Sequence, residues 1–428
     1  MNKLNKYAFS NLYDIASGIS TTKTQAGHGT AFVSFSTVFN NIFLPDELPD
    51  LMETSEQEQE TYSIRKGDIL ITRTSETADE LAMSCVALKE YPGATYSGFV
   101  KRLRPKTIGV AYDKFMAFFL RSKYFRKVIN NNTIMTLRAS FNEDMFSFLT
   151  LYLPDYDVQI KVGDLLYNIE CKIQNNKRIN DNLAQQLCLL YDYWFTQFDF
   201  PDENGKPYRA SGGQMVWNED AKKDIPVGWN CAKLSDAVEG IRTGLNPRDN
   251  FKLGNGAIKY ITVKNLRSDG ILDFSGCDTI DETARAIVHR RSDVCTGDIL
   301  FASIAPLGRC HLVQESPQDW DINESVFSIR CNKITVTPEY LYMHLQGEAF
   351  VKKSTACSTG SVFKGIRINT LLDSRMLLPP MQIVEKFSKQ TKPIFSLQYK
   401  LNKEIQALTQ LRDWLLPMLM NGQATISD

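Results

Sequence analysis

Few residues of this sequence have the types and spacing that catalysis requires. Pro201-Asp202, followed by Asp220-Ala221-Lys222, formally fits the PD and D/ExK pattern of metal-dependent nucleases. That pattern is common by chance, and here it spans a glycine-rich stretch in which no evident pair of strands brings the carboxylates around a metal ion. A nuclease therefore remains only a minor alternative.

Signatures of cofactor or metal chemistry are equally scarce. The chain has no NPPY-like or DPPF-like tetrapeptide, and the segment LPPM at Leu378 lacks the polar residue that such a tetrapeptide needs. Gly360 to Gly365 is followed by Ile366-Arg367, where a phosphate-binding loop needs Lys and then Ser or Thr. The nine cysteines and four histidines never fall at zinc-ligand spacing. We expect no catalytic residue, no metal site and no cofactor bound by this chain.

Length and composition set the next bounds. With 428 residues, of which 43% are hydrophobic and 23% charged, the chain is too long for one ordinary core, so two or more globular domains are expected. The cysteines are scattered without a CxxC pair, which predicts reduced thiols and a cytoplasmic location. No apolar run follows the first lysines, and none approaches the roughly 20 residues that span a bilayer. We therefore expect no membrane association.

Charge is unevenly distributed along the chain. The net charge is zero, which at first counts against nucleic-acid binding because phosphate contacts need lysine and arginine. Residues 46–60 contain seven acids and no base, however, whereas residues 100–138 contain ten bases and only Asp113 as an acid. This distribution predicts a local basic face. A solvated helix face that acids balance after folding is an equally open alternative.

Segments about 222 to 230 residues apart repeat the same order of motifs. Their shared order and spacing indicate an internal duplication. Gly67 and Gly297 fit a turn before a buried strand, so we assign the GDIL motif to the fold and not to chemistry. The matched pairs are LYDIASGI and LSDAVEGI, FVSFSTV and YITVKNL, KGDILIT and TGDILFA, VKRLRPK and FSIRCNK, LYLPD and MLLPP, and Gln159-Ile160 and Gln382-Ile383.

Each half ends in a long stretch of helical periodicity. Residues on one face of 162–194 step alternately by four and three, the spacing of a coiled-coil seam, and those of 384–415 do the same. Asn176 and Asn180 fall on the seam, where they would fix its register; exposure to solvent or to a third chain is the open alternative. Pro393 lies inside the second stripe and predicts a kink or a break, which makes one continuous second helix doubtful.

Two segments carry a resemblance to a known family. The first, Tyr191 to Trp229, reads YDYWFTQFDFPDENGKPYRASGGQMVWNEDAKKDIPVGW, and the second, Leu411 to Gln423, reads LRDWLLPMLMNGQ. Together with the paired GDIL motifs and the LP or LPP before each helix, they make the chain resemble the specificity subunit of Type I restriction-modification systems over essentially its whole length.

The resemblance implies an α+β fold with an internal repeat. Two tandem mixed α/β target recognition domains would be separated by two long helices that form an antiparallel coiled coil with pseudo-twofold symmetry. The expected parts are a first recognition domain at 1–155, a spacer helix at 156–198, a connector at 199–229, a second recognition domain at 230–379, and a second spacer helix at 380–421 that is kinked near Pro393.

The resemblance also implies partners. The chain would be a non-catalytic subunit that reads a split, asymmetric target in double-stranded DNA. Two modification subunits would methylate adenine with S-adenosylmethionine, and restriction subunits would use ATP and Mg, so these cofactors belong to the partners. A coiled-coil scaffold that binds no DNA is the alternative function.

Aromatic residues at the junction of the first long helix and the connector, and one in the second helix, suit a protein interface. We expect them to dock modification subunits, although burial of the connector cluster inside the chain's own helix junction is an open alternative. The residues are Tyr191, Tyr193, Trp194, Phe195, Phe198 and Trp414.

Three polar loops in each half could reach DNA. Sequence readout needs donors and acceptors on protruding segments, with lysine or arginine nearby to hold phosphates. The loops follow the LxDxxxGI motif, follow GDIL, and precede the long helix; for any one residue, a turn or capping role is the open alternative. With the first two bases of VKRLRPK, the candidates are Ser20, Thr21, Thr22, Lys23, Arg73, Thr74, Lys101, Arg102, Arg138, Ser140, Arg242, Thr243, Ser303, Ser358, Thr359, Ser361 and Lys364.

Overall fold

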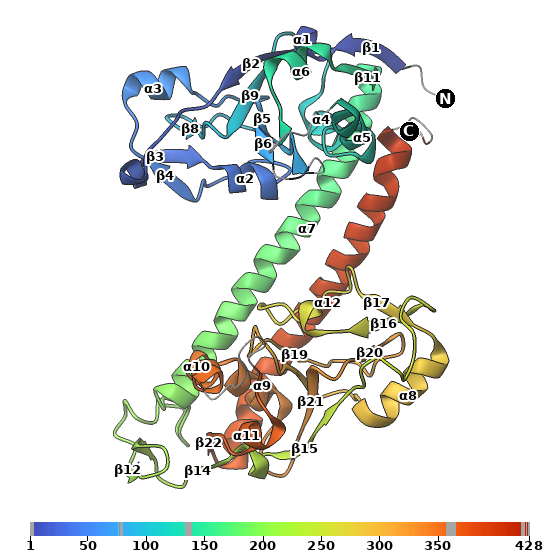
Figure 1. Ribbon diagram of the computed structural model, residues 1–428. Helices are drawn as coiled ribbons and strands as arrows, with labels where there is room; N and C mark the ends of the chain where they lie inside the picture. Colours follow the sequence, from blue (N-terminus) through green and yellow to red (C-terminus); the bar gives the residue numbers. More distant parts are fainter. Residues whose placement is uncertain are drawn as a thin grey trace. The chain divides into compact units, whose positions relative to one another are not determined.

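The computed structural model describes residues 4–75, 77, 80–132, 139–356, 365–420, 424 and 426. The chain divides into two compact units (Figure 1). Unit 1 comprises Met1–Asn175 and Ile405–Asp428, and unit 2 comprises Asn176–Glu404. Each unit thus contains a part of both long helices, whereas the sequence suggested that the helices are parts separate from the recognition domains.

Two sheets form most of the β-structure of unit 1. The four-stranded sheet is antiparallel and has the order β2-β9-β5-β7, and the three-stranded sheet has the order β4-β3-β8. The short pairs β1-β11 and β6-β10 accompany them. The strands are β1 (Leu4–Ala8), β2 (Tyr13–Ser17), β3 (Ala26–Val33), β4 (Asp50–Met52), β5 (Ile69–Thr72), β6 (Thr74–Ser75), β7 (Ser84–Val86), β8 (Thr95–Tyr96), β9 (Val100–Pro105), β10 (Ala139–Ser140) and β11 (Thr150–Pro154).

Strand β5 is buried on both faces. Ile69 and Ile71 pack into one hydrophobic cluster of unit 1, and Leu70, which lies between them, packs into another. A strand covered on both sides reads as an uninterrupted apolar run, which explains why the residues after GD do not alternate. Phe115 and Phe119 of α4 belong to the same cluster as Ile69. The short helices of unit 1 are α1 (Phe9–Leu12), α2 (Phe35–Asn40), α3 (Glu56–Thr61), α4 (Asp113–Phe119), α5 (Lys123–Asn132) and α6 (Glu143–Phe148).

Unit 2 has the same plan. Its sheets have the orders β15-β21-β18-β19 and β17-β16-β20, and the pairs β14-β22 and β12-β13 accompany them. The strands are β12 (Met215–Asn218), β13 (Lys223–Pro226), β14 (Asn230–Lys233), β15 (Val238–Thr243), β16 (Ile258–Ile261), β17 (Asp278–Ile280), β18 (Ile299–Ala302), β19 (Cys310–Leu312), β20 (Trp320–Ile322), β21 (Val326–Cys331) and β22 (Arg375–Leu378). The short helices are α8 (Glu282–Ser292), α9 (Pro338–Gln346), α10 (Glu348–Ala356) and α11 (Ile368–Leu372).

The topology confirms the internal repeat. The four-stranded sheets of the two units match strand for strand, with antiparallel neighbours throughout. In both three-stranded sheets the middle strand is antiparallel to one neighbour and parallel to the other. Gly67 and Gly297 have φ angles of 87° and 90°, in the left-handed region that favours glycine, so the assignment of GDIL to the fold is also confirmed.

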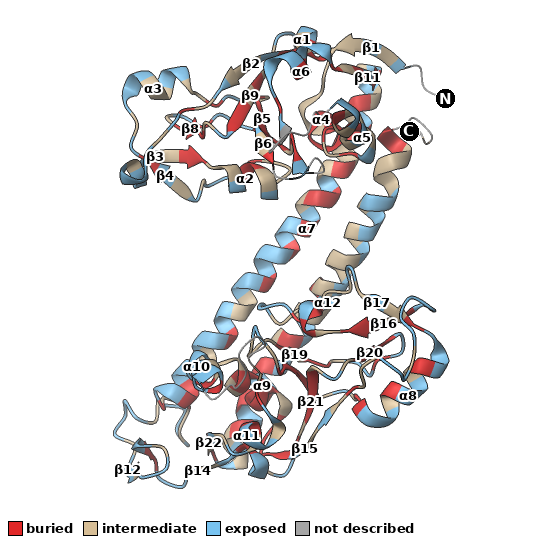
Figure 2. Ribbon diagram, in the orientation of Figure 1, coloured by how far each residue is buried: buried red, intermediate tan, exposed pale blue. Residues whose placement is uncertain are grey.

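Helices α7 (Tyr156–Tyr191) and α12 (Met381–Met420) run antiparallel to each other within unit 2. There Asn176 Nδ2 donates to Glu404 Oε2 at 2.8 Å, and Asn180 Nδ2 donates to Asn402 Oδ1 at 2.6 Å. Residue numbers therefore rise along α7 in the direction in which they fall along α12. Figure 2 shows buried positions recurring along α7, as a seam requires. The α+β fold with two long packed helices is confirmed, and both asparagines face the partner helix.

The doubt about a continuous second helix is wrong. Helix α12 passes through Pro393 without a break. Proline removes one backbone donor and strains the preceding turn, at a cost of about 3 kcal/mol. Val384, Phe387 and Phe395 are buried in the core of unit 2 on either side of Pro393, and their burial offsets that cost because each contributes roughly 1.5–3 kcal/mol.

Candidate nucleic-acid interface

The first predicted loop follows β2 in unit 1 and is largely exposed. Ser20, Thr22 and Lys23 are exposed and Thr21 is half-buried. Thr22 also has a local role, because its backbone N–H donates to Gln25 Oε1 at 3.0 Å and its hydroxyl donates to the same atom at 2.9 Å. The hydroxyl of Ser20 and the ammonium of Lys23 therefore remain the better-placed contacts of this loop.

The second and third loops meet at the β6-β10 pair. Thr74 lies opposite Ser140 in this pair, and the side chains of Arg73 and Ser140 are exposed while Thr74 is half-buried. The backbone of Arg73 is held on both sides, since its N–H donates to Phe99 O at 2.8 Å and its carbonyl accepts from Phe141 N at 2.8 Å. A fixed backbone with an exposed guanidinium suits a residue that contacts a ligand.

A fourth segment, which the sequence analysis missed, joins these loops. The turn at residues 97–100 connects β8 to β9, and Gly98 N donates to Ile19 O at 2.7 Å, directly before the first loop. Its next residue, Phe99, is 62% exposed. We call residues 20–23, 73–74, 97–99 and 140 the unit 1 loop cluster.

Lys101 and Arg102 do not belong to this surface, and their prediction as DNA contacts is corrected. Lys101 is 5% exposed, with its Nζ 3.3 Å from Ser17 Oγ and 3.4 Å from Glu143 Oε1. The Arg102 guanidinium donates to Ser63 O at 2.6 Å. Both residues lie on β9, which has a neighbouring strand on each side, so their charged groups serve the fold.

Most bases of the predicted basic face bind partners inside unit 1. Arg104 binds Asp68, Lys114 binds Asp164 at 2.8 Å, and Arg121 donates to four backbone carbonyls. The hydrogen bond from Lys114 is the largest cause that lowers the pKa of Asp164. Lys123 and Lys127 of α5 stay exposed. The positively charged surface is therefore smaller than the run of bases in the sequence predicted.

In unit 2 the corresponding loops carry different groups. Arg242 is exposed and forms an ion pair with Asp293, while Thr243 Oγ1 accepts from Arg291 Nη2 at 3.4 Å. Although partial burial acts to raise the pKa of Asp293, the hydrogen bond from Arg330 and the charge of Arg242 lower it overall. Arg290 and Arg291, at the end of α8, are exposed bases. They were not among the predicted contacts, although the segment HRR could have indicated them.

The prediction of Ser303 as a DNA contact is also corrected. Ser303 is 5% exposed, and its hydroxyl donates to Ser325 O at 2.7 Å, so it is not available to DNA. The remaining predicted contacts lie outside the described residues: Arg138, Ser358, Thr359, Ser361 and Lys364.

The prediction that the aromatic cluster docks a modification subunit is corrected for three of its residues. Trp194, Phe195 and Phe198 are 2–3% exposed and pack in the core of unit 2, for example with Phe195 against Tyr340 at a ring-centroid distance of 4.6 Å. These three residues are therefore buried in the chain's own helix junction, as the alternative interpretation of the cluster predicted. Their rings follow the end of α7 and pack around it. Tyr191 is partly buried in the same cluster.

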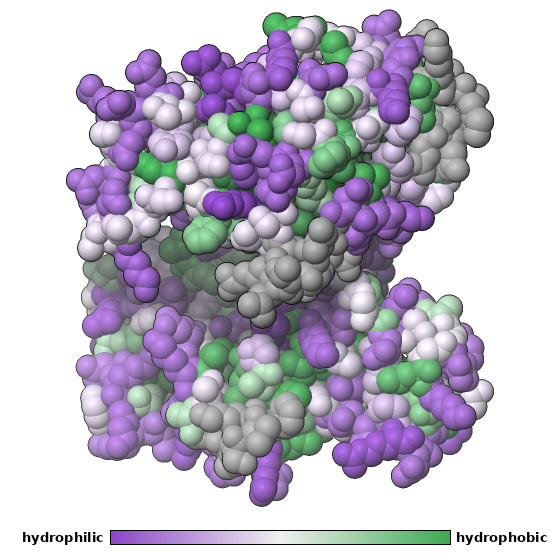
Figure 3. Space-filling model, turned by 45° about the horizontal axis from the view of Figure 1, so that its top comes forward, coloured by the Kyte–Doolittle hydropathy of each residue, from purple (hydrophilic) through white to green (hydrophobic). Residues whose placement is uncertain are grey.

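Other aromatic and apolar side chains remain exposed. Tyr193 is 37% exposed in unit 2, and Trp414 and Leu411, three residues apart on α12 in unit 1, are 62% and 42% exposed. Hydrophilic residues cover most of the face shown in Figure 3, with small hydrophobic patches between them. Tyr193, Trp414 and Leu411 are thus accessible to a partner.

The acids of the nuclease-like pattern have local roles. Asp202 Oδ1 accepts the backbone N–H groups of Asn204 and Lys206, both at 2.8 Å, and Asp220 pairs with Arg375 at 3.0 Å. Within the described parts of the chain, no group of three or more His, Cys, Asp or Glu is placed to hold a metal ion. No helix in those parts has both the length and the apolar character needed to cross a membrane.

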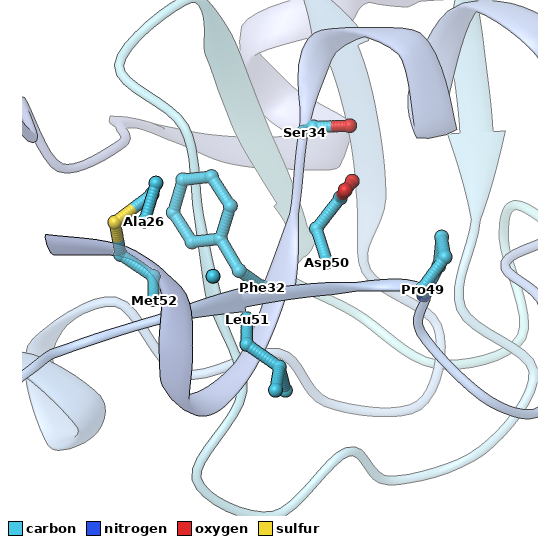
Figure 4. Close-up of a pocket in the computed structure, with 8 residues that line it drawn as sticks. Ala26, Phe32, Ser34, Pro49, Asp50, Leu51 and Met52 are labelled. Carbon is cyan, nitrogen blue, oxygen red and sulfur yellow. The ribbon is translucent and has the colours of Figure 1, made fainter. Parts of the chain in front are cut away.

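A pocket of about 360 Å³ lies beside the β3-β4 pair (Figure 4). Phe32 and Met52 line it with apolar groups, and Ser34 and Asp50 contribute oxygen atoms. Asp50 Oδ2 accepts a hydrogen bond from Thr37 Oγ1 at 3.3 Å. Because the pocket lies in the acidic stretch of the chain, it is a poor site for DNA phosphate, and we assign no ligand to it.

No family model matches the sequence. Two curated relatives align with most of it. The Type I restriction enzyme MjaIX specificity subunit of Methanocaldococcus jannaschii is 23% identical over 367 residues, which cover 85% of this chain and 79% of the relative. The Type I restriction enzyme HindI specificity subunit of Haemophilus influenzae is 22% identical over 445 residues, which cover 92% and 94%. The chain belongs to the family of Type I restriction enzyme specificity subunits.

A solved structure shares the fold of this specificity subunit. The crystal structure of the Type-I restriction-modification system S subunit from M. genitalium matches with a TM-score of 0.62 at 13% identity, covering 98% of this chain and 96% of that one. The recognition of the family from the connector and terminal segments is confirmed. As a specificity subunit, the chain is a non-catalytic component.

Proposed function

We propose that this specificity subunit reads a split, asymmetric target in double-stranded DNA, one half with each unit. The repeated scaffold supports the proposal best. Arg73 N donates to Phe99 O at 2.8 Å in unit 1, and Ser303 N donates to Ser325 O at 3.0 Å at the equivalent place in unit 2. Equivalent positions thus carry an exposed arginine in unit 1 and a buried serine in unit 2, so the two units would contact DNA through different residues, which suits two half-sites of different sequence.

In unit 1 the contacts would come from the loop cluster. Arg73 and Lys23 can bind a phosphate or a guanine edge. The hydroxyls of the cluster can exchange hydrogen bonds with bases or phosphates: Ser20, Thr21, Thr22, Thr74 and Ser140. Replacing Arg73 with alanine should weaken DNA binding and reduce its salt dependence if the contact is a phosphate. Arg102→Ala is the matched control, because that guanidinium binds Ser63 O and its loss should affect stability instead.

In unit 2 we propose Arg242, Thr243, Arg290 and Arg291 as contacts. The three arginines are exposed and Thr243 is half-buried, and Arg242 and Thr243 contact Asp293 and Arg291 at the end of α8. The candidates outside the described residues stay in the proposal: Arg138, Ser358, Thr359, Ser361 and Lys364.

The partners would be two modification subunits and the restriction subunits of a Type I complex. S-adenosylmethionine would belong to the modification subunits, and ATP with Mg to the restriction subunits. We place docking of a modification subunit on Tyr193 in unit 2 and on Trp414 and Leu411 in unit 1, because exposed aromatic side chains are frequent anchors of protein interfaces. The complex would act in the cytoplasm.

Mapping of adenine methylation tests the function. Genomes with and without this gene, each carrying the modification partner, are compared for methylated motifs. Disappearance of one split, asymmetric motif supports the proposal. If no split motif changes while the partner is active, the proposal is wrong.

Two variants assign parts of that motif. Exchange of residues 1–150 for those of another specificity subunit should change only one half-site. A seven-residue insertion in both α7 and α12 keeps the seam periodicity and should change only the length of the gap. A change in both half-sites by either variant would contradict the division of roles.

A coiled-coil scaffold without DNA binding is the second candidate function. It shares the helices but does not require two β-rich units with unlike loops. Retention of the assembled complex on duplex DNA at moderate salt separates the two, because a scaffold would not be retained.

A further inference from the structure

Phe99 is an exposed aromatic side chain in the middle of the unit 1 loop cluster. Its ring is 62% exposed, although burial of a phenylalanine side chain is worth roughly 1.5–3 kcal/mol. The residue before Phe99, Gly98, lies close to Ser20, and the backbone of Phe99 is bonded to that of Arg73. Ser20 and Arg73 are exposed polar and basic residues. An exposed ring beside such residues suits contact with a nucleic-acid base.

The backbone that carries this ring is rigid. Phe99 N donates to Ser97 Oγ at 3.2 Å, and Phe99 O accepts from Arg73 N at 2.8 Å. Gly98 packs closely against the first loop, where a Cβ would lie 3.1 Å from Ile19 O and 3.3 Å from Ser20 Oγ. The turn therefore fixes the backbone position from which the ring projects, and preorganisation of this kind lowers the entropic cost of a contact.

Unit 2 contains the same turn without the ring. Val326 N donates to Asn323 O as Val100 N donates to Ser97 O, and Ser325 N donates to the Asn323 side chain at 3.0 Å. Ser325, at the position of Phe99, is half-buried. The repeated turn is thus part of the scaffold, whereas the side chain on it differs between the units.

We propose that Phe99 is a specificity-determining residue, which makes an apolar contact with a base in the half-site read by unit 1. The proposal rests on the proposed function of the chain. Thymine is the base whose C5-methyl group offers such a contact in the major groove. Arg73, whose backbone is bonded to that of Phe99, would hold the neighbouring phosphate or base edge.

The test uses the complex of the full chain with its modification subunits. Phe99→Ala and Phe99→Leu are compared with Ile108→Ala, a matched control that is 96% exposed in the same unit and follows the other end of β9. Melting curves verify that each variant folds. Methylated motifs are mapped, and dissociation constants are measured for a duplex with the target and for a scrambled duplex.

Phe99→Ala should relax one position in one half-site and weaken binding to the target duplex by about 5- to 150-fold, the range that a mismatch at one base pair of a site typically costs. Phe99→Leu should lose less, because it keeps an apolar group. Binding to the scrambled duplex and its salt dependence should not change, since the ring carries no charge. Ile108→Ala should behave like the unaltered chain.

Three outcomes overturn the inference while leaving the proposed function intact: an unchanged motif and affinity, an equal loss on both duplexes, or a loss of complex assembly that would place Phe99 in a protein interface. If the unaltered complex methylates no split motif, the proposed function itself fails, and the role of Phe99 fails with it.

Discussion

Asp298 binds the guanidinium of Arg330 through two parallel hydrogen bonds, Nε to Oδ1 at 2.8 Å and Nη2 to Oδ2 at 2.9 Å. Asp68 and Arg104 do the same in unit 1, at 2.8 and 2.6 Å. The hydrogen bond to its aspartate is the largest cause that raises the pKa of each arginine. In both units this bidentate pair ties the GDIL turn to the neighbouring strand, β21 or β9, and so fixes the strands that carry the loops.

We expect Asp298→Asn to destabilise unit 2 by about 1.5–3 kcal/mol. Asparagine lacks the negative charge that accepts the two hydrogen bonds of Arg330, and hydrogen bonds to charged groups contribute about this much. Arg330 keeps its ion pair with Asp293. Urea unfolding followed by tryptophan fluorescence measures the effect, because Trp194, Trp229 and Trp320 are all buried in unit 2.

Glu315→Gln is the control for Asp298→Asn. Its carboxylate pairs with Lys403 on the surface of unit 2, where ion pairs contribute little. The midpoint of unfolding should therefore not change. Equal midpoints for the two variants would show that the Asp298–Arg330 pair does not hold the turn.

The GDIL motif also shows how far the sequence could lead. Its repetition, its glycine and its apolar residues were enough to predict a turn and a buried strand. The arginine partners could not be predicted, because Arg104 and Arg330 lie more than 30 residues further along the chain and only strand pairing brings them to the aspartates. Lys101 and Arg102 were misassigned for the same reason: a base looks free in sequence until the fold gives it a partner.

Aromatic residues were a second limit of prediction. Trp194 and Tyr193 are neighbours, yet one is buried and the other exposed. Composition predicts that such a cluster is important, but it cannot tell a core from an interface, since both bury aromatic rings. Phe99 was not predicted as a contact, because a single phenylalanine before a strand usually indicates a residue of the hydrophobic core.

The helix seam of unit 1 contains an ion pair between Glu170 and Arg412, with 2.6 Å between Oε2 and Nη1 and side chains 7% and 19% exposed. We expect Arg412→Met to lower the free energy of unfolding of unit 1 by about 3 kcal/mol, because it leaves a buried carboxylate without its partner. Circular dichroism during urea unfolding measures this loss.

The double variant Glu170→Leu, Arg412→Leu is the control for the single one. It should regain most of the stability, since replacement of a buried pair by apolar residues is often neutral or stabilising. A double variant as unstable as Arg412→Met would mean that the single loss does not come from the unpaired charge.

Acidification should destabilise unit 2 through His344. Burial, with a smaller contribution from the charge of Lys353, lowers the pKa of His344 from 6.5 to about 4. Between these two values the unfolded chain binds the proton more readily than the folded chain, so stability is complete above pH 6.5 and falls as the pH approaches 4. The loss between pH 7.5 and pH 5 should be about 2 kcal/mol.

Tryptophan-monitored unfolding at both pH values checks this. The variant His344→Gln, which cannot titrate, should show a correspondingly smaller difference between pH 7.5 and pH 5. His311, whose pKa burial also lowers, should keep part of the pH dependence. An unchanged pH dependence in His344→Gln would exclude His344 as its source.

Assembly with the modification subunit should depend on Trp414. Trp414 is 62% exposed on α12, one helical turn from Leu411, and tryptophan is enriched among the few interface residues that contribute about 2 kcal/mol or more to binding. We therefore expect Trp414→Ala to weaken the complex by about 30-fold or more, as measured by isothermal titration calorimetry with the purified modification subunit. Phe148→Ala removes a ring that is 84% exposed elsewhere in unit 1 and should leave the affinity unchanged. If both variants bind like the unaltered chain, the docking surface lies elsewhere, and Tyr193→Ala then tests unit 2 in the same assay.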